Sequence, residues 1–489
     1  MNEVIFTDTT LRDGQQSLWA IGMRTDMMLP VAETLDGAGF GAIEIFGNSF
    51  AKKMARELRE NFWERIDLAR QRIRKTPLRV IRSRYLAAFQ ITPDSLDELW
   101  YRRMAAHGIR QVRVSDASNT AAGWRRQLGY ARKAGIDPIV NLIFTISPRH
   151  TDAYYAGKAR ELAGLGPYRM CLKDPASLLT PERTRTLVPA ILENANGIPV
   201  ELHTHCHTGL GPLCALEAIK LGVRHVDAAI PPLADASSNP SLFNVVRNAR
   251  ALGYKANVDV ERLKQVEKHF TAIAQREGLP IGAPAAYDCY QYIHQVPGGM
   301  ISNLKHQLSL AGLGDKLEDV LEETAKVRAE FGYPIMVTPY SQFVGVQATM
   351  NVVSGERYQH VSDEVIQFAL GLWGEEESSS MDQNVRDRIL GRARAGELAR
   401  HQSPQPTLQE LRRTYAGPGV SDDDLLLCYF AGVEQVAAMR AEGPVKRRAV
   451  AAHGLAGLID ELGKRKSLKY FNVQTGGLSL TLRSGGDKP

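Results

Sequence analysis

Several features that would place the chain in a specialised class are missing from its sequence. No apolar stretch is long enough to cross a bilayer, and the opening residues have neither the basic start nor the apolar run of a signal peptide. The five cysteines are odd in number and show no CxxC or other paired metal spacing. We therefore expect a cytoplasmic protein with reduced cysteines that is neither exported nor membrane-spanning.

Low complexity and a concentrated charge are missing as well. Hydrophobic residues make up 44% of the chain and charged residues 23%, and only the final residues collect Gly, Ser and Lys. The formal net charge of +6 is spread over short runs instead of one basic strip. Because a nucleic-acid interface clusters its basic residues within a recognisable module, we expect a globular protein without a nucleic-acid partner. Anionic substrates fit this charge as well.

Short apolar runs alternate with amphipathic helical stretches at intervals of roughly thirty residues, which is typical of repeated βα units. The predicted strands are Val4 to Asp8, Ala42 to Gly47, Leu78 to Arg82, Gln111 to Asp116, Pro138 to Phe144, Arg169 to Asp174, Val200 to His205 and His225 to Ile230. Eight parallel strands favour an α/β fold of the (β/α)8 TIM barrel type over a doubly wound open sheet. We assign residues 1–283 to this barrel.

From about residue 284 the pattern changes to helices with long turns. We predict a mainly helical C-terminal region over residues 284–470 and a tail over residues 471–489 that frays or forms a short hairpin. Within the helical region, the segment SPQPTLQELRRTYAGPG has enough Pro and Gly to suggest a linker.

Polar residues at the carboxyl ends of the predicted strands are the first candidates for function, because a barrel of this kind builds its active site there. The candidates at or just after strand ends are Asp8, Arg82, Lys173, Asp174, His203, His205, Ser237 and Ser238.

The histidine pair in this set suggests a metal site. His203 and His205 are two positions apart on a strand, so their side chains leave the same face. An isolated pair of this kind is more often a polar strand end, but together with Asp8 it supplies two nitrogens and an oxygen. This donor set suits Zn, Mn, Co or Fe better than Mg or Ca, and the ion would polarise a substrate carbonyl. His207 lies beyond the strand end and is at most a pocket residue.

The remaining candidates leave alternatives open. Lys173 could be a Schiff-base lysine, an anion clamp, a carbamylated metal ligand or half of an ordinary pair with Asp174. Arg82 is the natural partner for a substrate carboxylate, because guanidinium and carboxylate share two parallel hydrogen bonds, and Arg12 is a second candidate. Cys206 is not assigned a catalytic role, since no Cys-His-Asn order is present.

Four motifs of the chain are DTTLRDGQQS (8–17), LKDPASLL (172–179), HTHCHTGLG (203–211) and ADASSNPS (234–241). In their order and spacing they resemble the carboxyltransferase domain of pyruvate carboxylase and the alpha subunit of oxaloacetate decarboxylase. These are biotin-dependent members of the HMG-CoA lyase-like superfamily of metal-dependent barrels. The resemblance continues through VPGGMISNLKHQL, YPIMVTPYSQFVGVQATMNVVSGERY and VSDDDLLLCYF to about residue 440. It implies a TIM-barrel carboxyltransferase domain over residues 1–283, followed by the helical region of such enzymes.

The resemblance also implies the chemistry. A carboxyl group would move between biotin and a small keto acid such as pyruvate or oxaloacetate, through a metal-stabilised enolate. The metal, Zn, Mn or Co, would be held by Asp8, His203, His205 and Lys173, with Lys173 as a carbamate formed with carbon dioxide. Ser237 stands where the family has a threonine that shuttles a proton between biotin and the enol.

The same resemblance places the substrate. Arg82 matches the arginine that binds the substrate carboxylate, and Gln16 or Gln15 lies near a polar contact that follows the first aspartate. Arg12 remains a further candidate for catalysis. The family's RG-x-N stretch reads Arg82, Ser83, Arg84 and Tyr85 here, and a later tyrosine position reads Phe89, so the substrate need not be pyruvate.

No biotin-attachment AMKM sequence follows the barrel, and the string AKKM at residues 51–54 falls on a predicted helix. We therefore expect biotin to arrive on a separate biotin carboxyl carrier protein that a separate biotin carboxylase subunit serves. We also expect a homodimer or a hetero-oligomer.

Three other interpretations are open. A biotin-independent lyase, decarboxylase or aldolase would use the same enolate chemistry. A synthase of the isopropylmalate or homocitrate type shares the DTTLRDG start and the histidine pair, but the C-terminal region and Lys173 in a KD motif argue against it. A scaffold without activity would not need the full ligand set.

Overall fold

A computed structural model gives the fold of the chain and describes residues 2–87, 90–296, 304, 308–309, 312–400, 405–417, 419–445, 470–475 and 478–483. The chain forms two compact units, Met1–Pro444 and Val445–Pro489. The second unit contains an antiparallel hairpin of β9 (Tyr470–Thr475) and β10 (Leu478–Arg483), which is one of the two outcomes expected for the tail. Among the described residues, no helix has the length and apolar character needed to cross a membrane.

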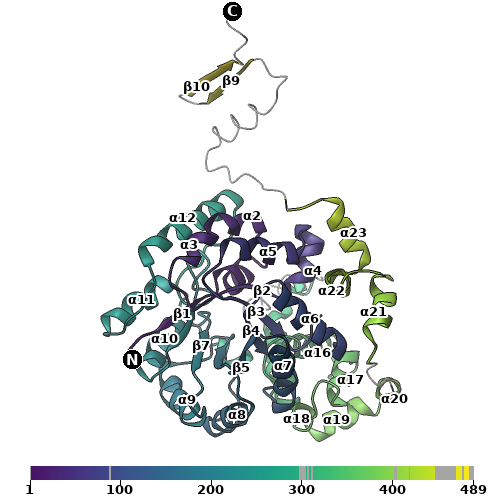
Figure 1. Ribbon diagram of the computed structural model, residues 1–489. Coiled ribbons are helices and arrows are strands. Elements are labelled where there is room, and N and C mark those ends of the chain that lie inside the picture. The colour runs from purple at the N-terminus through teal and green to yellow at the C-terminus, as the bar shows by residue number, and fades with distance from the viewer. Residues whose placement is uncertain are drawn as a thin grey trace, which may run out of the picture. The chain divides into compact units, whose positions relative to one another are not determined.

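The first unit contains a closed barrel of eight parallel strands in sequence order, in which β8 pairs with β1 (Figure 1). The strands are β1 (Ile5–Asp8), β2 (Ala42–Gly47), β3 (Leu78–Ser83), β4 (Gln111–Ser115), β5 (Asp137–Ile143), β6 (Arg169–Asp174), β7 (Val200–Thr204) and β8 (His225–Ala228). Their ends differ from the predicted ones by no more than two residues. The predicted TIM barrel is confirmed.

Helices form the outer layer of the barrel. They are α1 (Gln15–Leu18), α2 (Thr25–Met28), α3 (Ala32–Asp36), α4 (Phe50–Lys53), α5 (Phe62–Arg72), α6 (Asp94–Ala106), α7 (Ala121–Lys133), α8 (Asp152–Leu165), α9 (Pro181–Asn194), α10 (Gly211–Lys220), α11 (Leu242–Ala251) and α12 (Val260–Glu277). Short turns of other helix types occur at η1 (Thr10–Gly14), η2 (Leu29–Val31) and η3 (Met54–Leu58). The AKKM string lies on α4 and the start of η3, as expected of a helical segment.

Alternation along the strands decides which side chains enter the barrel. On β4, for example, Val112 and Val114 belong to the apolar core that the helices cover. Arg113, between them, pairs with Asp227 of β8 across the interior. The interior position on β4 that follows Arg113 is Ser115, at the carboxyl end of the strand. The same alternation applies to every strand and determines which strand-end residues reach the mouth of the barrel.

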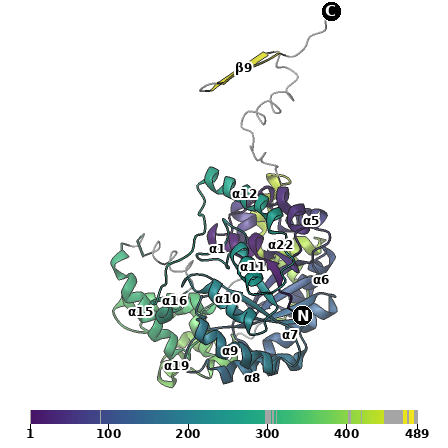
Figure 2. The same cartoon turned by 90° about the vertical axis from the view of Figure 1, so that its left-hand side faces the viewer.

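The predicted helical region is present and contains a core of its own. Its helices are α13 (Gln291–His294), η4 (Gly314–Lys316), α15 (Leu317–Glu330), α16 (Tyr340–Ser354), α17 (Asp363–Ala369), α18 (Glu375–Ser378), α19 (Gln383–Leu390) and α20 (Ala393–Arg400). Aromatic side chains fill this core, where Phe368 packs against Phe331, Tyr340 and Phe343. Figure 2 shows α15, α16 and α19 gathered on one side of the barrel.

The last helices of the first unit pack on the barrel itself. They are α21 (Leu408–Tyr415), α22 (Asp422–Ala431) and α23 (Val433–Ala441), and α22 runs beside α4 and α6 (Figure 1). The linker predicted over residues 403–419 is wrong over Leu408–Tyr415, which form α21. Thr407 and Glu410 form a reciprocal capping box that starts α21 between the flanking Pro and Gly residues. The boundary predicted at residue 283 lies inside one compact unit and stays a prediction.

Candidate active site

Two histidines and one aspartate converge at the mouth of the barrel. His203 Nε2 lies 3.3 Å from Asp13 Oδ2, and His205 Nε2 lies 3.3 Å from Asp13 Oδ1. The two Nε2 atoms are 3.1 Å apart. Of the residues that the structure describes, this is the group of His, Cys, Asp or Glu side chains whose ligand atoms are close enough to share a metal ion.

The far side of each imidazole is already occupied, which turns Nε2 toward Asp13. His203 Nδ1 lies 2.6 Å from Asp227 Oδ2, and His205 Nδ1 donates to the carbonyl oxygen of Ser237 at 2.8 Å. A carboxylate or carbonyl behind a metal-binding histidine fixes its tautomer and its ring orientation. Two nitrogens and a carboxylate facing one another at these distances therefore fit a divalent ion of the Zn, Mn or Co type.

Asp13 reaches this position because of the local backbone after β1. It lies in η1, a single π-helical turn, a distortion that is often found at functional sites. Gly14 follows, and a Cβ atom there would lie 2.6 Å from the carbonyl oxygen of Leu233, so only glycine allows this close approach between the loops after β1 and β8. Burial alone would raise the pKa of Asp13, but Arg12 and the two histidines hold it well below its usual range.

The structure corrects the expectation that Asp8 accompanies the histidines. Asp8 pairs with Ala228 in the barrel, one position after Thr7 pairs with the inward-facing Asp227, so its side chain leaves the opposite face of β1. There it accepts hydrogen bonds from the backbone and hydroxyl of Thr10 and supports the turn that carries Asp13. Burial raises the pKa of Asp8 to about 7.

The cluster opens into a cavity of about 280 Å³ at the carboxyl ends of the strands. Its wall contains Arg12, Asp13, Gln16, Ser17, Ser49, Ile81, Ser83, Ser115, Lys173, Pro175, His205, His207, Ser237, Val337, Thr338 and Ser341. The helical region therefore supplies part of the wall from the end of the α15 to α16 connection and from α16. The structure brings the sequence candidates Arg12, Gln16, Lys173, His205 and Ser237 together here.

Two of these candidates have defined contacts, and a third, Lys173, has a shifted pKa. Arg12 forms ion pairs with Asp13 at 2.6 Å and with Glu44 at 2.5 Å. Burial and the neighbouring Arg12 lower the pKa of Lys173 to about 8. The Ser237 hydroxyl donates to the carbonyl oxygen of Ser17 at 2.9 Å.

Arg82 and Gln15 do not line the cavity, which corrects two further expectations. Arg82 pairs with Val114 of β4 and therefore faces the helices, where it forms a buried ion pair with Asp97 of α6. Gln15 is buried, and its side chain accepts a hydrogen bond from the backbone of Met23. Phe89, where a family hydroxyl is missing, lies outside the described residues.

His207 and Cys206, the two other candidates of the HTHCH segment, have different environments. His207 lines the cavity with its ring stacked on His205 at a centroid distance of 5.8 Å, and burial lowers its pKa to about 3. Burial raises the pKa of the Cys206 thiol well above its usual value, so the thiolate that a nucleophile requires is disfavoured. The decision not to assign Cys206 a catalytic role is consistent with this environment.

A network of buried charges lies beneath the candidate ligand group of Asp13, His203 and His205. Arg113 pairs with Asp227 and Glu201, and Arg79 pairs with Glu201 at 2.6 Å, all four side chains being fully buried. Arg169 also reaches Glu201 at 2.7 Å. Burial alone would raise the pKa of Glu201, but the three guanidinium groups hold it well below its ordinary value. The network continues upward through Asp227 to His203, so it holds a candidate ligand in place.

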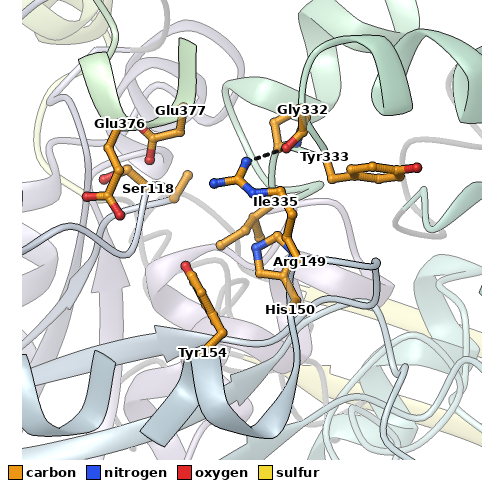
Figure 3. Close-up of a pocket in the computed structure, with 11 residues that line it drawn as sticks. Ser118, Arg149, His150, Tyr154, Gly332, Tyr333, Ile335, Glu376 and Glu377 are labelled. Atoms are coloured by element: carbon orange, nitrogen blue, oxygen red, sulfur yellow. Dashed lines mark hydrogen bonds between the residues drawn. The ribbon is translucent and has the colours of Figure 1, made fainter. Parts of the chain in front are cut away.

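Two more cavities border the helical region. One of about 490 Å³ is walled by the ends of β3 and α22 and shares Ser49, Ser83 and Thr338 with the cavity above the candidate ligand group. The other, of about 20 Å³, has room for about one water molecule (Figure 3). The close-up shows Glu377 on one side of it and Arg149, which donates to the carbonyl oxygen of Gly332, on the other. Burial raises the pKa of Glu377 to about 8.

The sequence considerations missed Asp13, Ser83, Ser115 and Ser341. Asp13 stands five positions after Asp8 in the DTTLRDG motif, and choosing the residue at the strand end selected Asp8, which does not face the histidines. Applying strand alternation to β3 and β4 would have selected Ser83 and Ser115 over Arg82. Ser341 lies far along the chain, and only tertiary contact brings it to the barrel.

Comparison with known proteins agrees with this geometry. The model of the HMGL-like family matches residues 3–269, and the model of a conserved carboxylase domain matches residues 292–440. A pyruvate carboxylase subunit of Methanocaldococcus jannaschii is 36% identical over 76% of this chain and 66% of its own length. The 5S subunit of methylmalonyl-CoA carboxyltransferase from Propionibacterium freudenreichii is 30% identical over 97% of this chain and 96% of its own.

A solved structure is similar as well. The carboxyl transferase domain of Rhizobium etli pyruvate carboxylase superposes with a TM-score of 0.81 at 25% sequence identity, covering 91% of this chain and 78% of that one. The chain spans about two thirds of the length of the M. jannaschii protein. The resemblance found in the motifs is confirmed. The chain belongs to the HMGL-like family, within which its conserved carboxylase domain groups it with the carboxyltransferase subunits and domains of biotin-dependent carboxylases.

Proposed function

We propose that the chain is the carboxyltransferase subunit that moves a carboxyl group between biotin and a small keto acid. The observation that carries this proposal is the group of Asp13, His203 and His205, which opens into a cavity that also holds Lys173 and Ser237. The family model and the conserved carboxylase domain support the same activity. The use of a keto acid as substrate, of a separate biotin carrier and of a bound metal ion is part of this proposal.

The ligand set follows from the donor atoms. Asp13, His203 and His205 would hold a divalent ion, with Lys173 as a fourth ligand in the form of a carbamate. Asp13 takes the place that the sequence had suggested for Asp8. When bound, the ion supplies Lewis-acid polarisation of the keto oxygen, which favours loss of a proton from the neighbouring carbon.

The chain's own residues would bind the acid and move the proton. Arg12 lines the cavity and takes over the role of carboxylate partner that was expected of Arg82, with the Gln16 amide beside it. The Ser237 hydroxyl donates to the Ser17 carbonyl in this structure. A rotation about its χ1 would turn this hydroxyl into the cavity. There its Oγ would hold the proton that passes between biotin and the enol, as a serine has the rotamer freedom that a threonine lacks.

The biotin would come from outside the chain. We propose a biotin carboxyl carrier protein and a biotin carboxylase subunit as partners in a homodimeric or hetero-oligomeric assembly. The 490 Å³ cavity shares its wall with the metal cavity through Ser49, Ser83 and Thr338 and is the proposed route for the biotin arm. We also propose a cytoplasmic location, because all five cysteines are free.

The alternatives differ in what they leave unexplained. A synthase of the isopropylmalate type would not account for the carboxylase domain at residues 292–440. A biotin-independent lyase would use the same metal cluster and the same enolate, so it is the alternative that an experiment has to separate.

The deciding experiment combines elemental analysis of the purified full chain with oxaloacetate decarboxylation in the presence and absence of free biotin. One metal ion per chain and turnover that biotin stimulates would support the carboxyltransferase. Bound metal with turnover that biotin does not affect would identify the lyase instead. A protein that neither binds metal nor turns over would contradict both.

A further inference from the structure

Two serines stand side by side in the wall of the metal cavity. Ser83 and Ser115 are paired positions on the neighbouring strands β3 and β4, and both line the cavity. Their interior direction follows from alternation, because Arg79 on β3 and Arg113 on β4 also enter the barrel. No hydrogen bond to either hydroxyl is found within the described part of the chain. Two neighbouring hydroxyl donors therefore face the cavity.

A third hydroxyl of the same wall comes from the helical region. Ser341 lies in the first turn of α16 and is fully buried. Its Oγ has no hydrogen-bond partner among the described residues. A buried hydroxyl without a partner is costly, and a ligand in the cavity would relieve this cost. This observation is independent of the pair on β3 and β4 and points to a polar ligand group.

The serine pair and the metal cluster are on opposite sides of the barrel mouth. In a closed barrel of eight strands in sequence order, β3 and β4 lie across from β7 and β8, and β7 carries the histidines. An acid whose keto group is held at the cluster presents its far end to Ser83 and Ser115. A methyl group there, as in pyruvate, would offer these hydroxyls no hydrogen-bond acceptor.

The chemistry of the pair favours a carboxylate over other polar groups. A carboxylate has two oxygens that only accept hydrogen bonds, and hydroxyl donors to such an anion form short, strong bonds. Asp116, which follows β4, is paired with Arg84 at 2.6 Å, so its charge is balanced.

We propose that Ser83, Ser115 and Ser341 recognise a second carboxylate on the substrate, so that the acceptor is a 2-oxo dicarboxylate and not pyruvate. This inference rests on the proposed carboxyltransferase function and assigns the substrate class of the same site. The three serines act as specificity residues, because they contact the end of the acid that does not react.

The test measures binding to the metal-loaded full chain by isothermal titration calorimetry. The three probes are pyruvate, 2-oxobutyrate, which adds an apolar carbon, and 2-oxoglutarate, which adds a carboxylate. We expect 2-oxoglutarate to bind at least about tenfold more tightly than the other two, as two hydrogen bonds to a charged group imply. The double variant Ser83→Ala/Ser115→Ala should lose this preference while its affinity for pyruvate stays unchanged.

Controls separate the inference from the function on which it rests. Ser379→Ala changes an exposed serine outside the cavity and should keep the preference. Carboxyl transfer from carboxybiotin to each of the three acids, measured on the same samples, reports the proposed function whichever acid is the acceptor. Pyruvate or 2-oxobutyrate binding as tightly as 2-oxoglutarate would overturn the dicarboxylate proposal even when that turnover is present. An effect of the double variant on biotin affinity, with no change for keto acids, would also overturn it.

Discussion

The interior of the barrel contains buried charged side chains, whereas the interior of the helical region is an aromatic core. Beneath the candidate ligand group, Arg79, Arg113, Glu201 and Asp227 are fully buried and joined by ion pairs. In the helical region, Phe331, Phe343 and Phe368 pack with other aromatic rings and form no ion pairs. Both interiors end at the same cavity, which they wall from two sides.

The two interiors contribute differently to the cavity that they share. Replacing a buried ion network with apolar residues is often neutral or stabilising, so such a network is weak evidence for stability. Here it ends on His203, and its fixed geometry serves to orient a candidate ligand. The aromatic core has no such network. Its packing, together with the hydrogen bonds that Arg328 donates to the Pro334 carbonyl and the Thr145 hydroxyl, positions Thr338 and Ser341 over the barrel mouth.

The largest expected effect tests whether Asp13 or Asp8 is the aspartate that binds the proposed metal ion at the charged barrel interior. Asp13→Asn should abolish metal binding and lower turnover at least about a hundredfold, because it removes a ligand of the Lewis acid. Asp8→Asn should retain metal, since the burial that raises the pKa of Asp8 to about 7 already favours its neutral form. Metal content by elemental analysis checks both, and metal loss in Asp8→Asn alone would restore Asp8 to the ligand set.

The next effect tests whether the buried ion network orients His203 for metal binding or only stabilises the fold. Asp227→Asn removes a buried charge that faces Arg113 and His203, which should cost about 3 kcal/mol of unfolding free energy. It should also weaken metal binding about 10- to 100-fold. Urea denaturation and competition with a chelator measure the two quantities. Asp363→Asn, which breaks the exposed pair with Arg394, is the control and should change stability by less than about 0.5 kcal/mol. Unchanged metal affinity in Asp227→Asn would reduce the network to a structural role.

The smallest effect concerns Glu377, whose carboxyl group is buried in the helical region without a hydrogen-bond partner among the described residues. Both carboxylate oxygens of Glu377 lack hydrogen bonds among the described residues, and burial raises its pKa from 4.5 to about 8. Between these values the folded chain keeps a proton that the unfolded chain has released, so this group lowers stability as pH rises toward 8. Glu377→Gln should therefore stabilise the protein at pH 9 by on the order of 2 kcal/mol relative to pH 5.

Thermal or urea unfolding of the variant and the parent at the two pH values gives this difference. Glu376→Gln is the matched control, because its half-exposed carboxylate is paired with Lys158 at 2.7 Å. It should change stability by a similar small amount at both pH values. A difference between Glu377→Gln and the parent that does not depend on pH would show that Glu377 has a partner or is solvated.

The candidate site shows which steps of sequence interpretation hold and which fail. His203, His205 and Lys173 were assigned to strand ends and do reach the barrel mouth. Asp8 and Arg82 were assigned by the same rule, but they stand on the outward face of their strands and support the loop after β1 and the helix layer. A strand end is visible in the apolar pattern, whereas the inward direction depends on barrel register, which links residues far apart in the chain.

The sequence by itself determined the parts that depend on local periodicity and on short motifs. Alternation of strand and helix patterns predicted the barrel and the helical region, and the four motifs identified the family. Tertiary structure decided which aspartate faces the histidines, the outward direction of Arg82 and the presence of Ser83, Ser115 and Ser341 in one cavity wall. These features depend on strand closure and on the packing of α16 over the barrel, where hydrophobic contact and burial between distant segments select one arrangement that no local pattern specifies.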